Sequence, residues 1–277
     1  MINILPKNEI TIRLAFFFGA LMLFAIWELI APKRKLMVSK IKRWSSNISI
    51  IVINSILIRL LFPAALIGAA YYALQHHYGL FNITQINYTI TIITSVIFLD
   101  FVIYLQHVMF HAVPLFWRFH RMHHVDLDID VTTGVRFHPI EILISLFIKF
   151  AAVMIIGAPL LAVIIFEILL NTITLFNHSN IQMPRIIDRI IRAVIVTPDM
   201  HRVHHSEIPN ETNSNFGFNL SIWDRFCGTF EDQPSLGHTN MIIGIKEIRE
   251  PKYCVNLLGM LILPFIKGKS NYPLNRK

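Results

Sequence analysis

Histidine is the residue that stands out in this chain, because eight of its thirteen histidines fall into three short motifs. An H-x-x-x-H pair is followed by an H-x-x-H-H triplet within RFHRMHH, and a second triplet of the same form lies in TPDMHRVHHS. The eight residues are His107, His111, His120, His123, His124, His201, His204 and His205. Imidazole is a common metal ligand, so this density of histidines in an otherwise apolar chain predicts a metal centre.

The spacing of the three motifs suits helices. Residues four apart on a helix have Cβ atoms roughly 5–6 Å apart, so His107 and His111 can direct two rings at one place. Within each triplet the spacing predicts three rings along one stripe of a helix. Eight or more imidazoles exceed the ligand number of an octahedral ion, so two ions are the simplest interpretation. Imidazole suits iron, copper, zinc and nickel, so the ligand type alone leaves the metal open.

Several other polar residues are candidates for the same centre. His178, in FNHSN, emerges from an apolar segment towards the motifs and is predicted to be a further ligand. His138, in RFHPIE, is predicted to support a ligand ring or to have a structural role. The second nitrogen of a metal-bound histidine usually binds an acceptor, and Asp100, Asp126 and Asp199 are candidates for that role.

The composition is that of a membrane protein. Hydrophobic residues make up 54% of the chain and charged residues only 15%, with a mean hydropathy of +0.55, whereas soluble domains carry about 25% charged residues. The two cysteines provide neither a disulfide framework nor a C-x-x-C motif. The net charge of +8 is typical of basic cytoplasmic loops rather than of nucleic-acid binding.

Hydropathy predicts several membrane crossings. Residues 11–31 and residues from about 48 to 74 are apolar over the roughly 20 residues that a crossing needs. A third span begins near Tyr88 and carries the H-x-x-x-H pair at or beyond its end. The loop after the first span is rich in basic residues, which predicts a cytoplasmic location for that loop. These basic residues are Lys33, Arg34, Lys35, Lys40, Lys42 and Arg43.

Residues 140–177 are apolar and too long for one crossing. As a single helix they would measure about 55 Å, against a hydrocarbon core of about 30 Å. Gly157-Ala158-Pro159 predicts a break in the middle. A hairpin or re-entrant pair would bring the second triplet back to the face of the first. We therefore expect an all-α integral membrane bundle of about four spans, including that pair, with a cytosolic helical histidine-rich cap that binds metal.

The order of the motifs also carries a family resemblance. The pair and the two triplets, interleaved with apolar spans and accompanied by RFHP and SIWDRFCGTFE, resemble the fatty acid hydroxylase superfamily, which includes the sterol desaturases. The resemblance extends from about Ser95 to Glu231. With the hydropathy it implies an N-terminal membrane-spanning region (1–94), a catalytic domain with the histidine motifs (95–235) and a C-terminal interfacial tail (236–277).

The resemblance implies a non-haem di-iron oxygenase embedded in a membrane. Such an enzyme would hold two iron ions, use O2 as co-substrate, and hydroxylate or desaturate a C–H bond of a sterol, fatty acyl chain or alkylglycerol. The eight motif histidines match the family's ligand positions and are the expected catalytic centre, and His178 resembles an additional ligand. Some members have another histidine four residues before it, where this chain has Thr174, so one ion is expected to have a different ligand set or to keep a water. Asp100, His138 and Asp199 are the expected supports of the ligand rings.

The same interpretation implies partners and a location. The sequence contains no G-x-G-x-x-G fingerprint for a nucleotide cofactor. The electrons would therefore come from a separate ferredoxin, cytochrome or reductase. The expected partners are a lipid substrate and the membrane, without nucleic acid. The Ile/Asn/Lys-rich composition suits a bacterial inner membrane, with the metal site on the cytoplasmic side.

Three other functions are compatible with a histidine-rich membrane protein. A membrane cytochrome would bind haem between two histidines, but it needs no triplets. A zinc-dependent hydrolase commonly needs a carboxylate beside its metal, as in H-E-x-x-H, and the sequence has no such motif. A non-catalytic metal-binding or lipid-binding protein would retain the motifs without activity. Within the oxygenase interpretation, hydroxylation and desaturation both begin with hydrogen abstraction, and the sequence favours neither; we take hydroxylation as the working prediction.

Overall fold

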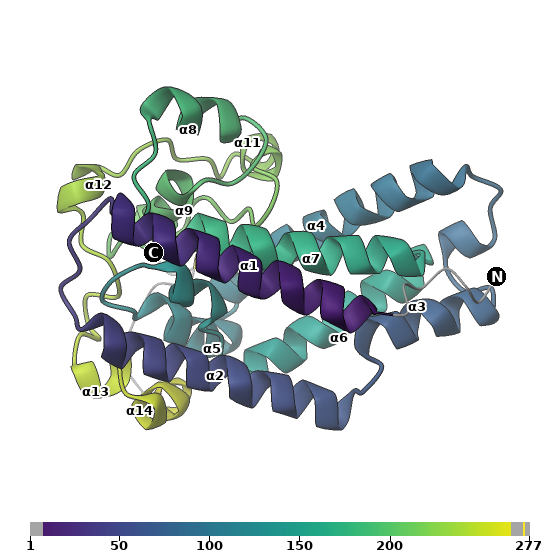
Figure 1. Ribbon diagram of the computed structural model, residues 1–277, viewed down its shortest axis with the longest axis horizontal. Coiled ribbons are helices and arrows are strands. Elements are labelled where there is room, and N and C mark those ends of the chain that lie inside the picture. Colours follow the sequence, from purple (N-terminus) through teal and green to yellow (C-terminus); the bar gives the residue numbers. More distant parts are fainter. Residues whose placement is uncertain (1–7, 267–273, 275–277) are drawn as a thin grey trace.

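The computed structural model describes residues 8–266 and residue 274, and this part of the chain is helical with four isolated bridges and no strand (Figure 1). The prediction of an all-α fold is therefore confirmed. The longer helices are α1 (Glu9–Ile30), α2 (Lys40–Leu61), α3 (Ala65–Gln75), α4 (Tyr88–Ala112), α5 (Pro114–His124), α6 (Pro139–Ile156) and α7 (Leu160–His178). The shorter helices are α8 (Arg185–Ile191), α9 (Pro198–His204), α10 (Pro209–Thr212), α11 (Ile222–Cys227), α12 (Gly237–Asn240), α13 (Pro251–Cys254) and α14 (Leu257–Ile262), and the 3₁₀ turns are η2 (Leu80–Asn82), η3 (Val131–Val135) and η4 (Leu263–Phe265).

Five helical segments of the described chain are long and apolar enough to cross a membrane. They are Glu9–Ile30, Lys40–Gln75, Tyr88–Ala112, Pro139–Ile156 and Leu160–His178. Helix α7 is central to the bundle, because it packs against α1, α3 and α4. The protein is thus an integral membrane protein, and the hairpin arms, counted separately, bring the number of candidate spans to five.

The second span differs from its predicted form. The helix begins at Lys40, earlier than the predicted start near residue 48, and it ends at Leu61 before a short break that contains Pro63. Proline removes a backbone donor and clashes with the preceding turn, so a new helix, α3, starts at Ala65. The candidate span Lys40–Gln75 is therefore two helices in sequence rather than one continuous helix.

The apolar segment of residues 140–177 is a helical hairpin, as predicted. Helix α6 ends at Gly157, which adopts the left-handed conformation with φ 70°, and α7 follows directly after Pro159. Gly79 packs so tightly there that an added Cβ would lie 2.2 Å from the Gly157 nitrogen. At the opposite end, Glu141 of α6 and His178 of α7 both contact the first histidine triplet. The chain therefore returns to the face from which it started, which rules out a single crossing.

The basic loop after α1 fastens the cap to the membrane helices. Lys33 Nζ lies 2.7 Å from Asp199 Oδ2, beside the second triplet. Arg34 donates to the backbone carbonyls of His238 at 2.5 Å and Met241 at 2.7 Å. Sequence alone would give the basic residues of this loop the role of orienting the protein in the membrane. In the structure Lys33 and Arg34 also hold the cap, so the loop and the cap lie on the same side of the bundle.

Arg43 is the most enclosed of these attachments. Its side chain is 0% exposed and forms two parallel hydrogen bonds with Asp126, both at 2.8 Å. It also donates to Asp130 Oδ2 at 2.5 Å and to the Asp128 carbonyl at 3.1 Å. Because the aspartates follow the first triplet directly, this fork fixes the chain that leaves α5 to the start of α2. Asp126 therefore pairs with an arginine and does not accept from a histidine.

The C-terminal part of the described chain packs against α5. Arg121 Nη2 donates to the carbonyls of Leu263 at 2.7 Å and Ile266 at 2.8 Å. Met260 and Leu263 are buried in the same apolar cluster as Trp117. The division into regions 1–94, 95–235 and 236–277 stays a prediction, and residues 1–7, 267–273 and 275–277 of those regions lie outside the described residues.

Replacing Arg43 tests the importance of the buried fork. Arg43→Met removes the cation that contacts both Asp126 and Asp130 and leaves Asp126 with the longer ion pair to Arg136 at 3.9 Å. Removal of one partner of a buried ion pair typically costs about 3–5 kcal/mol. We expect a clear fall in the apparent Tm of the detergent-solubilised protein, measured by intrinsic fluorescence. Lys42→Met, at the exposed neighbouring position, is the control and should melt with the wild type. Equal melting of both variants would show that the fork adds no stability.

Candidate metal centre

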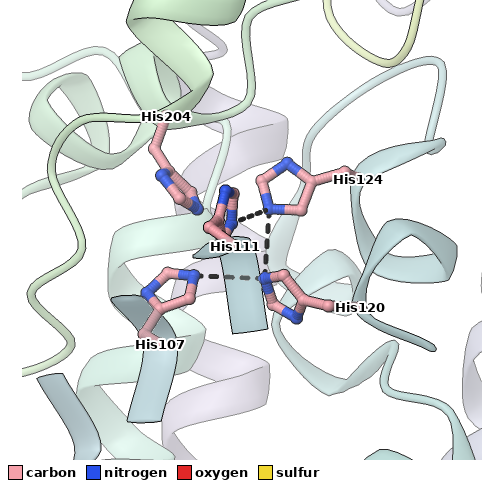
Figure 2. A group of neighbouring side chains, drawn as sticks. All are labelled: His107, His111, His120, His124 and His204. Carbon is pink, nitrogen blue, oxygen red and sulfur yellow. Dashed lines mark hydrogen bonds between the residues drawn. The ribbon is translucent and has the colours of Figure 1, made fainter. Parts of the chain in front are cut away.

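The structure brings all nine histidines that were expected to be ligands into two adjoining groups. His107, His111, His120, His124 and His204 form the first group, shown in Figure 2. His123, His178, His201 and His205 form the second group. Within each group one ligand atom from each ring lies within 4.8 Å of the corresponding atom of every other ring. The rings come from α4, α5, α7, α9 and the residue after α9, so the fold assembles the groups from the hairpin and both motif regions.

Each triplet is divided between the two groups. His120 and His124 face the first group while His123 faces the second. The second triplet has the reverse division, with His201 and His205 in the second group and His204 in the first. The first and last histidines of a triplet are four residues apart and differ by about 40° in direction around the helix. The middle histidine directly precedes the last one and differs from it by about 100°. One helix can therefore supply two ligands to one group and one to the other, which corrects the prediction of a single stripe.

The ring nitrogens in both groups face one another closely. In the first group, His120 Nε2 lies 3.1 Å from His107 Nε2 and 3.2 Å from His124 Nε2. In the second group, His178 Nε2 lies 3.1 Å from His123 Nε2 and 3.0 Å from His201 Nε2. Two imidazole nitrogens bound at right angles to one ion, each at roughly 2.1 Å, would lie about 3 Å apart. The spacing therefore fits shared metal ions.

Hydrogen bonds on the outer nitrogens decide which nitrogen of a ring carries the proton. His107 Nδ1 lies 2.8 Å from the Phe216 carbonyl, His178 Nδ1 lies 2.8 Å from the Thr174 carbonyl, and His204 Nδ1 lies 2.7 Å from the Ser214 carbonyl. Because a carbonyl oxygen can only accept, these Nδ1 atoms carry the hydrogens and the Nε2 atoms of the neutral rings present lone pairs. Lone pairs that converge in a buried site need a cation between them.

Unsatisfied nitrogens support the same conclusion. His204 Nε2 and both ring nitrogens of His205 are buried without a hydrogen-bond partner among the described residues. Buried polar atoms in folded proteins are nearly always satisfied. The donor set consists of imidazoles alone in both groups. These residues therefore fit a pair of transition-metal ions of the kind that imidazole binds.

Burial keeps the rings in the neutral form that binds metal. All nine side chains are between 0% and 2% exposed. Burial lowers the pKa of His120 to about 3. Burial and the neighbouring rings hold the pKa values of His123 and His205 well below the usual range. Protonation therefore does not compete with metal binding at neutral pH.

Sequence reasoning missed two acceptors that orient the ligand rings. Glu141 Oε1 lies 2.6 Å from His120 Nδ1, and Asn213 Oδ1 lies 3.1 Å from His111 Nδ1. A lone carboxylate in the first turn of the apolar helix α6 is the signal that could have identified Glu141, because a charge in such a helix needs a specific partner. Asn213 lies in a polar loop whose sequence gives no such signal.

The predicted supports of the rings have other partners. Asp100 accepts from Trp223 Nε1 at 2.8 Å and from the Leu220 N–H at 3.2 Å. Asp199 binds Lys33 and Arg202, and although burial alone would raise its pKa, Arg202 and the other cations lower that pKa to about 2. Asp100 and Asp199 therefore bind other groups than the ligand rings in this structure, and their role as supports of those rings stays a prediction.

His138 has the structural role that was one of its two predicted alternatives. It caps α6, where its Nδ1 accepts from the Ile140 N–H at 3.2 Å, and its Nε2 lies 3.3 Å from the Leu261 carbonyl. It belongs to neither histidine group. Thr174, which occupies the position of an extra histidine in some superfamily members, contributes only its carbonyl to His178.

Aromatic side chains surround the two groups. Phe137 stacks on His123 with ring centroids 4.6 Å apart, and Trp117 lies against His111 at 4.8 Å. Phe216 and Phe218 both lie edge-on to His107. This enclosure excludes water and strengthens every electrostatic interaction inside the site.

Comparison with known proteins agrees with this geometry. The Fatty acid hydroxylase family model matches residues 92–229, which include every histidine of both groups. Ornithine lipid hydroxylase OlsE of Rhizobium tropici is 31% identical over 204 residues, which cover 74% of this chain and 59% of that protein. Alkylglycerol monooxygenase of Xenopus tropicalis is 29% identical over 136 residues, covering 47% and 28%, and human lathosterol oxidase is 25% identical over 176 residues, covering 63% and 54%.

The matches cover less than two thirds of the length of each of these relatives. No solved structure matches the chain. The fold and the site together define a helical membrane protein with a histidine-rich centre. The chain belongs to the fatty acid hydroxylase superfamily.

The contact between Glu141 and His120 can be tested by metal affinity. Glu141→Gln keeps the shape of the side chain but removes the negative charge beside the ring, and loss of such an acceptor typically lowers metal affinity about 10–100-fold. We expect this loss in a competition titration of the metal-free protein with Fe(II) and a chelator. Glu247→Gln, at an exposed position, should bind as the wild type does. Unchanged affinity of Glu141→Gln would assign Glu141 a packing role only.

Proposed function

We propose that this protein is a membrane-bound non-haem di-iron oxygenase that hydroxylates a C–H bond of a lipid. The observation that carries the proposal is the pair of buried groups built from histidine alone, with converging unprotonated nitrogens. Membership of the fatty acid hydroxylase superfamily supports the reaction class. Five rings would hold one iron and four the other, so the second group would leave more room for further ligands.

The protein residues hold the ions, fix the ring orientations and keep water out. Backbone carbonyls at Phe216, Ser214 and Thr174 hold three rings in the tautomer that directs Nε2 inwards. The carboxylate of Glu141 makes His120 a stronger donor through its outer nitrogen. When bound, the irons would supply the activation of O2 that an unactivated C–H bond requires.

The balanced hydroxylation consumes the lipid R–H, O2, two electrons and two protons, and it yields R–OH and water. We propose that a separate ferredoxin, cytochrome or reductase delivers the electrons. The polar connection of the cap to the basic loop places the centre on that loop's side of the bundle. By the distribution of basic residues this is the cytoplasmic side, in our proposal that of a bacterial inner membrane.

A lipid substrate and hydroxylation are supported by the relatives. Their names describe activity on ornithine lipid, alkylglycerol and lathosterol, and two of the three names describe a hydroxylation or a mono-oxygenation. The candidate spans and the dry aromatic surroundings of the histidines suit an apolar substrate. We therefore propose hydroxylation, with oxygen rather than a double bond entering the lipid.

The geometry disfavours the rival functions. Haem would require a flat macrocycle between two ring nitrogens, whereas these nitrogens lie 3.0–3.2 Å apart in a fully buried group. A zinc hydrolase would need a carboxylate on the metal side of the rings, but Glu141 lies on the outer nitrogen of His120. Among the described residues neither group includes a carboxylate.

Metal content and product mass test the proposed activity together. We expect about two irons per chain after anaerobic purification in mild detergent, since the nine ligands exceed the capacity of one octahedral ion. Lipids from cells that express the protein under ¹⁸O2 should gain one labelled oxygen. Loss of two hydrogens instead would make the protein a desaturase. Stoichiometric zinc that persists after iron-supplemented expression would contradict the di-iron proposal.

His123→Ala tests the role of a predicted ligand in the second group. Removal of a ring that contacts His178 and His205 should lower the iron content and abolish hydroxylation, while the protein remains inserted in the membrane. His76→Ala, at an exposed position outside both groups, is the matched control and should keep full iron content and activity. Full occupancy and activity of His123→Ala would remove His123 from the ligand set.

A further inference from the structure

Helix α8 turns its one acidic residue inwards and its isoleucines outwards. Asp188, 6% exposed, faces the protein and lies 2.5 Å from Arg192, which is 4% exposed and also binds Asp232. The outward face carries Ile186 and Ile190, each 68% exposed. A helix in contact with water shows the opposite arrangement, with its apolar side against the core. The outward face of α8 therefore suits an apolar environment.

Helix α11 extends the same apolar face. The two elements are tied together, since Ser221 Oγ donates to the Arg192 carbonyl at 2.6 Å and the Ser221 N–H donates to the Val194 carbonyl at 2.9 Å, and they lie side by side in Figure 1. Phe226 on α11 is 85% exposed. We call the combined patch the α8–α11 surface. It comprises Ile186, Ile187, Ile190, Val194, Ile222 and Phe226.

The position of α11 against α4 brings this surface to the level of the membrane. Trp223 donates to Asp100 at 2.8 Å and packs against Phe101 with ring centroids 4.8 Å apart. Asp100 lies about 18 Å along α4 from its start at Tyr88, less than the roughly 30 Å of a hydrocarbon core. Because α4 is a candidate span, α11 is continuous with a lipid-facing part of the bundle.

The charges around the surface fit anionic lipid. Arg185 and Arg189 are exposed on α8, beside the isoleucines. The one acidic residue of α8, Asp188, is turned inwards and paired with Arg192. An apolar face flanked by free arginines is the pattern of helices that lie at the boundary between headgroups and acyl chains.

We propose that the α8–α11 surface is a membrane-contact site outside the five candidate spans, seated in the headgroup boundary of an anionic phospholipid leaflet. The continuity with α4 and the two arginines favour lipid over a second copy of the chain or a protein partner. The proposal does not depend on the reaction catalysed. The segment that carries α11 also supplies the Phe216 carbonyl to His107, so one loop braces both the lipid contact and the first histidine group.

A fluorescent label on the surface tests the proposal in the full chain. Cys227 is exposed and is replaced by serine, while Cys254 is fully buried and stays. Ile190→Cys, Phe226→Cys and, as the control on α12, Asn240→Cys are each labelled with an NBD dye in nanodiscs of phosphatidylcholine and phosphatidylglycerol. We expect blue-shifted emission at positions 190 and 226. Their ratio of quenching by doxyl-labelled lipid to quenching by iodide should be roughly tenfold higher than at position 240.

Two results would overturn the lipid contact. Quenching by iodide at positions 190 and 226 equal to that at position 240 would place the surface in water. Protection from both quenchers would mean that protein covers it, either a second copy or a partner. The unmodified Cys227→Ser chain reports any labelling of Cys254.

The arginines are tested in the same system. Arg185→Gln combined with Arg189→Gln should reduce lipid quenching at position 190 in discs that contain phosphatidylglycerol, and should leave it unchanged in discs of phosphatidylcholine alone. An equal effect of the double variant in both kinds of disc, or no effect in either, would show that anionic headgroups do not contact these side chains.

Discussion

Neutral imidazoles are best held in a buried site when the outer nitrogen of a ring is fixed by an acceptor and the other nitrogen is free for a cation, as in five of the nine rings here. This constraint explains the architecture around the centre. Carbonyls of Phe216, Ser214 and Thr174 and the side chains of Asn213 and Glu141 meet outer nitrogens of the rings. These acceptors lie on the loop before α11, on α6 and on α7, so the hairpin and the loop must be held in register with α4 and α5.

Buried ion pairs hold these helices and loops in position relative to one another. Arg43 joins the start of α2 to the chain that leaves the first triplet, and Lys33 joins the loop after α1 to Asp199 beside the second triplet. Glu28 of α1 accepts from the backbone N–H groups of Val131 at 2.6 Å and Asn180 at 2.7 Å. Apolar contacts between spans are not directional, whereas these hydrogen-bonded and charged contacts favour one arrangement. Charged side chains at the end of the bundle next to the cap therefore hold the cap in place.

The sequence identifies the histidines that gather in the structure because most of their signal is local. Spacings of three and four residues bring rings together on a helix and single out eight of them, while His178 was predicted from its position after the apolar segment and from the family resemblance. The partition into two groups could not be predicted, since His123 and His124 are adjacent in sequence yet face different groups. The acceptors Glu141 and Asn213 were missed for a related reason. Their role depends on how α6 and the loop at 213 dock against α4 and α5. The lone carboxylate of α6 indicates that Glu141 needs a partner, but no local pattern identifies His120 as that partner, and Asn213 gives no signal.

The orientation of α8 is a second feature that local sequence patterns do not predict. Hydropathy finds the long spans but passes over α8, whose seven residues are too few to cross a bilayer. The sequence RIIDRII is compatible with either face turned outwards. The pairing of Asp188 with Arg192, and of Arg192 with Asp232 from a distant loop, decides the orientation and turns the isoleucines away from the protein. A buried ion pair thus determines which surface of the cap is apolar, as buried ion pairs also determine how the cap sits on the spans.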